Sequence, residues 1–147
     1  MYQGDRPKGA VAGGMTDLEL LQARIPGYAD YADPDARHQV DKQIRAWLGE
    51  ALTEARDRLR PVGALAEQLD GLILRCEFSD YRVLRAVERA RFDQGLVDHV
   101  HALDRRIVEV GDRIRAATSP AELATALDDA ARALDERFGA IADAPPA

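Results

Sequence analysis

An apolar pattern near the end of the chain constrains its fold more than any other feature. Hydrophobic residues there alternate steps of four and three without interruption, at Leu96, Val100, Leu103, Ile107, Val110, Ile114 and Ala117. Such steps place all these side chains on one face of an α-helix and form a heptad seam, called here the 96–117 seam. A seam of this kind must be covered by another helix, so the chain is expected to fold as packed helices.

The covering helix is expected in the same chain. Ser119, Pro120 and Glu122 combine a hydroxyl cap, a first-turn proline and a capping-box glutamate, which together indicate a helix start. The connection is so short that the two helices should form an antiparallel hairpin. The facing stripe is Leu123, Leu127, Ala130, Leu134, Phe138 and Ile141. A two-stranded coiled coil with a second molecule is the alternative, because β-branched residues alternate with leucine along the seam. We expect a monomer or a weak homodimer.

A second long helix is predicted upstream, starting at a cap formed by Asp33 and Pro34 and reaching about Arg60. Its apolar stripe is Val40, Ile44, Trp47, Leu48, Ala51, Leu52, Ala55 and Leu59. Trp47 fits a core position better than an interface. The charges on the opposite face, including the i,i+4 pair Asp41 and Arg45, are expected in solvent.

Pro61 and Gly63 are expected to break this helix or to bend it strongly. A further stripe from Leu65 follows, with Cys76 on its buried side, where a cysteine is inert more often than reactive. A short segment after it could be capped by Ser79 or Asp80.

The predicted fold is all-α, an antiparallel bundle of four to five helices with coiled-coil-like hairpins. Residues 15–142 form one domain, with a flexible tail at 1–14 and a C-terminal tail at 143–147.

A distinctive turn joins the first helix to the second. Thr16 and Glu19 form a capping box at the start of the first helix, whose apolar face ends at Ile25. Pro26 disfavours further helix and Gly27 accepts positive φ, so the turn should be rigid. The candidate interaction or structural motif of this turn comprises Arg24, Ile25, Pro26, Gly27, Tyr28 and Tyr31. We interpret the two tyrosines as packed anchors, with a recognition surface as the alternative.

The motif Arg-Ile-Pro-Gly-Tyr at residues 24–28, with a second tyrosine three positions later, resembles a family of small uncharacterised bacterial all-helical proteins. The resemblance extends from about Leu18 to about Arg115 and includes Asp80-Tyr81 as a second motif. Asp30 and Asp80 stand where the family pattern has glycine, so turn geometry is expected to differ there. The resemblance implies a helical fold and carries over no chemistry.

Net charge and composition limit the classes of binding partner and the cellular setting that we expect. The formal net charge is −6, which disfavours nucleic acid, because proteins that bind phosphate backbones are usually basic. Cys76 is the single cysteine, so no intramolecular disulfide can form and a cytoplasmic setting is expected. No apolar run approaches the roughly 20 residues that span a bilayer.

Residue patterns for catalysis, cofactors and metals are weak, and we expect no catalytic residue, cofactor or metal site. No glutamate is followed by histidine three positions later, as a carboxylate-bridged metal bundle requires. The pairs Asp98 with His101 and His38 with Asp41 have one-face spacing but are expected to be exposed polar residues. Arg82, Arg85 and Arg89 share a helix face that could bind an anion or an acidic peptide, although a solvated face is favoured.

The predicted function is a non-enzymatic, cytoplasmic protein–protein interaction or scaffold module. The alternative is a helical bundle that binds a small ligand, an anion or a metal.

Overall fold

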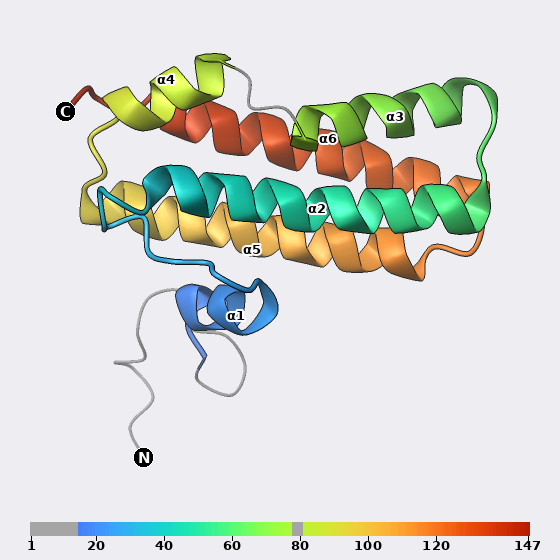
Figure 1. Cartoon of the computed structure of the whole chain (residues 1–147), viewed down its shortest axis with the longest axis horizontal. Helices are drawn as coiled ribbons and strands as arrows, with labels where there is room; N and C mark the ends of the chain where they lie inside the picture. Colours follow the sequence, from blue (N-terminus) through green and yellow to red (C-terminus); the bar gives the residue numbers. More distant parts are fainter. Residues whose placement is uncertain (1–14, 78–80) are drawn as a thin grey trace.

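The computed structural model describes residues 15–77 and 81–147, and this part of the chain is all-α (Figure 1). The helices are α1 (Asp17–Arg24), α2 (Arg37–Leu59), α3 (Gly63–Glu77), α4 (Tyr81–Arg89), α5 (Gln94–Ala116) and α6 (Pro120–Ala142). The predicted antiparallel bundle is confirmed, with six helices in the described residues instead of four to five, because α3 and α4 are separate. No helix among the described residues is long and apolar enough to cross a membrane. Predictions for the tail at 1–14 and for caps at Ser79 or Asp80 fall outside the described residues.

Three helices of 23 residues, α2, α5 and α6, form the centre of the bundle. α5 packs on both α6 and α2. Figure 1 shows α3 and α4 along one side of this centre and α1 on the other. This arrangement covers the 96–117 seam inside the chain: its residues are buried, with Leu96 half-buried at one end.

The helix boundaries follow the capping signals in most places. Thr16 and Glu19 form the predicted capping box. Ser119 caps α6 as predicted, although Glu122 Oε2 accepts from the amide of Thr118 rather than from that of Ser119. α2 ends where expected, with Arg60 in the left-handed region at φ 46° and a break before α3.

The predicted start of α2 is wrong. Asp33 and Pro34 lie in a series of turns, and the helix begins at Arg37. Asp33 Oδ1 accepts the amide of Asp35 at 3.0 Å, a local bond that favours a turn over a helix. Arg37 Nε donates to the carbonyl of Tyr31 at 2.7 Å and holds the turns against the helix start.

The C-terminal segment, predicted as a tail, is bonded to the bundle. Pro146 forms an isolated antiparallel bridge with Ala90. The amide of Arg91 donates to the carbonyl of Pro145, and the amide of Ala147 donates to the carbonyl of Arg89, each at 2.8 Å. These backbone bonds hold residues 145–147 beside the connection between α4 and α5.

Candidate functional site

The turn after α1 separates its residues into a buried and an exposed group. Ile25, Tyr28 and Tyr31 are buried, whereas Arg24, Pro26 and Gly27 are exposed. Gly27 has φ +81°, the positive value that the sequence predicted. Arg24 joins the turn to α5 through two bonds to Asp112, at 2.6 and 3.1 Å. The tyrosines therefore anchor the turn, and both hydroxyl groups enter a polar cluster inside the bundle.

The centre of this cluster is Arg137 of α6, which is only 3% exposed. Its Nε donates to Asp104 of α5 and its Nη1 donates to Asp41 of α2, each at 2.6 Å. Its Nη2 donates to the hydroxyl of Tyr31. One guanidinium thus connects all three long helices to the turn after α1, and its planar fork suits such multiple bonding.

Two further side chains complete this buried network, which comprises Tyr28, Tyr31, Asp41, Arg45, Asp104 and Arg137. Tyr28 donates its hydroxyl to Asp104 Oδ2 at 2.7 Å. Arg45 donates to Asp41 Oδ2 at 2.9 and 3.1 Å, and to the carbonyl of Cys76 at 3.1 Å. The expectation that Asp41 and Arg45 are solvated is therefore wrong, because Arg137 of α6 and the end of α3 cover this part of α2.

The two buried carboxylates have opposite pKa shifts. Burial raises the pKa of Asp104, and its bonds to Arg137 and Tyr28 offset only part of that effect. Burial alone would also raise the pKa of Asp41, but Arg137 and Arg45 together hold it below the usual value. Burial likewise raises the pKa of Cys76 to about 11, which fits the inert thiol that the sequence predicted.

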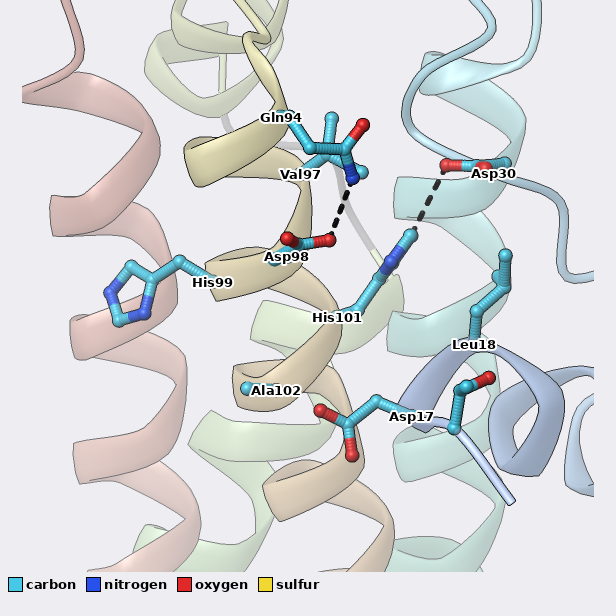
Figure 2. A pocket seen from close by; sticks show the side chains of 10 residues that line it. Asp17, Leu18, Asp30, Gln94, Val97, Asp98, His99, His101 and Ala102 are labelled. Atoms are coloured by element: carbon cyan, nitrogen blue, oxygen red, sulfur yellow. Dashed lines mark hydrogen bonds and ion pairs between the residues drawn. The ribbon is translucent and has the colours of Figure 1, made fainter. Parts of the chain in front are cut away.

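A surface pocket of about 420 Å³ lies next to this network, between the start of α1, the following loop and the start of α5 (Figure 2). We call it the His101 pocket. It is lined by Thr16, Asp17, Leu18, Asp30, Gln94, Val97, Asp98, His99, His101 and Ala102. Asp98 Oδ1 accepts from Gln94 Nε2 at 2.8 Å, and Asp17 pairs with Arg105 at 3.3 Å.

His101 is the least exposed polar side chain of this lining, at 5%. Its ring lies among aromatic neighbours, with centroids 6.1 Å from Tyr28 and 5.9 Å from Tyr31. Its Nε2 faces Asp30 Oδ1 at 3.5 Å, an ion-pair distance, but no hydrogen bond forms, so Nε2 is buried without a hydrogen-bond partner (Figure 2). Most buried polar atoms are hydrogen-bonded, so this atom marks a place where a ligand could bind.

The predicted polar pairs have different outcomes. Asp98 and His101 do share the pocket, and the expectation that both are exposed is wrong for His101. His38 and Asp41 are not brought together at a site: the exposed His38 lies 3.7 Å from Glu88, while Asp41 belongs to the buried network. In the described part of the chain, no three His, Cys, Asp or Glu side chains are placed to hold a metal ion.

The arginines of α4 lie away from the pocket. Arg82, Arg85 and Arg89 are exposed, and α4 packs on α6 and α2, while α1 packs on α5 (Figure 1). The Arg82 guanidinium lies 5.9 Å from the centre of the Phe138 ring. These residues therefore do not form one site with the turn of residues 24–31.

Sequence reasoning missed the network and the pocket, although one signal was present. Val97, His101, Asp104, Val108 and Gly111 recur at steps of three and four, beside the 96–117 seam. This second stripe predicts two polar side chains on a buried face of α5, which is where the structure places His101 and Asp104.

Comparisons of the chain with protein-family models, with curated proteins and with solved structures give no significant match. The resemblance to a bacterial helical family therefore rests on the motif residues alone, and the function is argued from the geometry.

Proposed function

We propose that this chain is a non-enzymatic, cytoplasmic interaction module that binds a protein partner, and that the His101 pocket holds a side chain of that partner. The observation that carries the proposal is the buried Nε2 of His101, which has no hydrogen-bond partner in the pocket wall. A ligand that bonds to this atom removes the cost of leaving it unpaired.

The pocket walls belong to a rigid frame, which favours binding. The buried network ties α5 to the turn after α1 through the bond from Tyr28 to Asp104, close to the pocket. A pre-formed pocket loses little conformational entropy when a ligand enters it. The same frame covers the 96–117 seam, which supports a monomer as the binding unit.

A small molecule in the same pocket is the second candidate. The pocket volume of about 420 Å³ lies within the roughly 300–1,000 Å³ typical of small-ligand sites.

Affinity capture with charge-reversed baits tests the proposal. Asp98→Arg places a cation in the pocket, whereas Asp128→Arg is a matched control, because Asp128 also accepts one bond from a glutamine amide, that of Gln68 at 2.8 Å, on another face. Quantitative mass spectrometry should find a protein retained by the wild type and by Asp128→Arg but lost from Asp98→Arg. Identical captured sets for all three baits would contradict a role for the pocket. A wild-type bait that retains nothing specific would contradict a protein partner and favour the small molecule.

A further inference from the structure

We propose that the group bound in the His101 pocket is a cation that carries N–H donors, namely an ammonium or guanidinium on an alkyl chain. The inference rests on the proposed function and specifies the chemistry of its ligand. Such a group has two natural sources, a lysine or arginine side chain of a partner protein or a free small amine.

Two acceptor atoms define the position of the cation. We assign the ring proton of His101 to Nδ1, so that Nε2 can accept a hydrogen bond and faces the carboxylate of Asp30. His101 Nε2 and Asp30 Oδ1 lie 3.5 Å apart without a hydrogen bond between them. A single ammonium placed beside both can donate to each, since N–H···O and N–H···N bonds are about 2.9 Å long. Asp30 Oδ1 also accepts the amide of Ala32 at 2.9 Å, which fixes the loop, and a carboxylate oxygen that accepts one N–H can accept a second from the cation.

Access to Nε2 depends on Asp30. The histidine atom has no contact with solvent, whereas the Asp30 side chain is 41% exposed at the surface of the loop. A cation that donates to Nε2 must therefore displace this carboxylate, and Asp30 then serves as its negative partner.

The charges around the pocket favour a cation over an anion. Asp17, Asp30 and Asp98 all line it, and Arg105 is the cationic neighbour that pairs with Asp17. The N-termini of α1 and α5 also point here and would attract an anion. One free amide at each of these helix starts is already bonded to a local cap, because Thr16 accepts from Glu19 and Asp93 accepts from Leu96. The carboxylates of the lining therefore favour a positively charged ligand.

The apolar part of the lining accounts for the alkyl chain. Leu18, Val97 and Ala102 contribute hydrocarbon surface beside the carboxylates. An alkyl ammonium covers this surface with its methylene groups and places its charge at Asp30 and His101, whereas a hydrated inorganic cation would leave the surface exposed to water.

Amide NMR titrations of the whole protein test the inference with three probes: n-butylammonium, butyrate, and an acetylated Gly-Lys-Gly amide. We expect n-butylammonium, and not butyrate, to shift the amides of Leu18, Val97 and Ala102. Asp30→Asn keeps the bond to Ala32 but removes the charge, so it should weaken n-butylammonium binding about tenfold, the effect of losing one charge-assisted bond. The matched control Asp128→Asn should change binding by less than about twofold.

The peptide identifies the source of the cation. Tighter binding of the lysine peptide than of n-butylammonium assigns the pocket to a basic side chain of a partner protein, and the reverse order assigns it to a free amine. Binding of butyrate as strong as that of n-butylammonium, or no shift with either cation, overturns the inference. If the Asp98→Arg bait still loses its partner in that case, the binding site stands and only the ligand class is wrong.

Discussion

The Trp47 indole lies directly against the backbone of Gly111, so that a β-carbon built at position 111 would be 2.2 Å from Cζ3 of the indole. This close approach joins the middle of α2 to the C-terminal part of α5. It places Trp47, which is 8% exposed, in the core as the sequence predicted.

Gly111→Ala should therefore destabilise the protein by about 1–3 kcal/mol, the usual cost of overpacking a core, although alanine normally favours a helix. Gly139→Ala is the control, because it also lies inside a long helix and an added β-carbon there meets nothing within 4 Å. We expect that variant to gain about 0.5–1 kcal/mol. Urea denaturation measures both values, and equal effects of the two substitutions would contradict the close contact.

Arg137→Met should lower the free energy of unfolding by about 3–5 kcal/mol, because it leaves Asp41 and Asp104 buried without their shared cation. Arg132→Met on the same helix is the control: Arg132 is exposed and its pair with Asp129, at 3.1 Å, is worth less than about 1 kcal/mol. Thermal and urea unfolding compare the two variants. A loss below 1 kcal/mol for Arg137→Met would show that the network contributes little to stability.

The opposite pKa shifts of the two carboxylates predict opposite pH dependences. Asp41 has a lowered pKa in the folded state, so its contribution to stability is present above the unfolded pKa, near 3.8, and is lost as the pH falls through the folded pKa. Asp104 has a raised pKa, so its contribution is present below 3.8 and is lost as the pH rises through the folded pKa.

Asp41→Asn should consequently cost more free energy of unfolding at pH 7 than at pH 3, whereas Asp104→Asn should cost more at pH 3 than at pH 7. Urea denaturation of both variants and the wild type at the two pH values provides the measurement. The same sign of pH dependence for both variants would contradict the assignment.

Gly27→Ala should destabilise the protein by about 1–2 kcal/mol. The cause is the backbone, since φ is +81° and an added β-carbon meets only Gln43, at an ordinary 3.5 Å. Gly71→Ala, inside α3 with no atom within 4 Å of an added β-carbon, should be stabilising by about 0.5–1 kcal/mol. A neutral Gly27→Ala variant in urea denaturation would show that the turn adopts negative φ.

Local signals predicted much of the fold. The 96–117 seam, the Thr16 cap and the break after Arg60 depend on residues close in sequence, and periodicity and capping rules describe such features well. The start of α2 was missed because Asp33 bonds locally in a turn, which the capping pattern alone does not distinguish from a helix start.

The buried network and the pocket depend on distant residues. Asp41 and Arg137 are 96 positions apart, and no spacing rule relates them. A charged residue on a helix is usually exposed, so Asp41 and Arg45 were placed in solvent. Only the tertiary fold brings Arg137 of α6 to Asp41 and so supplies the cation that makes burial of Asp41 favourable.

Histidine-selective NMR of the unmodified protein tests the central claim, that ligand binding occurs at His101. His38, His99 and His101 are the only histidines, so their side-chain signals are readily assigned. With n-butylammonium or the lysine peptide, the Nε2 signal of His101 should move in a saturable way, while His38, which lies beside Glu88 away from the pocket, stays unchanged. An unmoved His101 signal, or equal shifts at His38 and His101, would contradict the account.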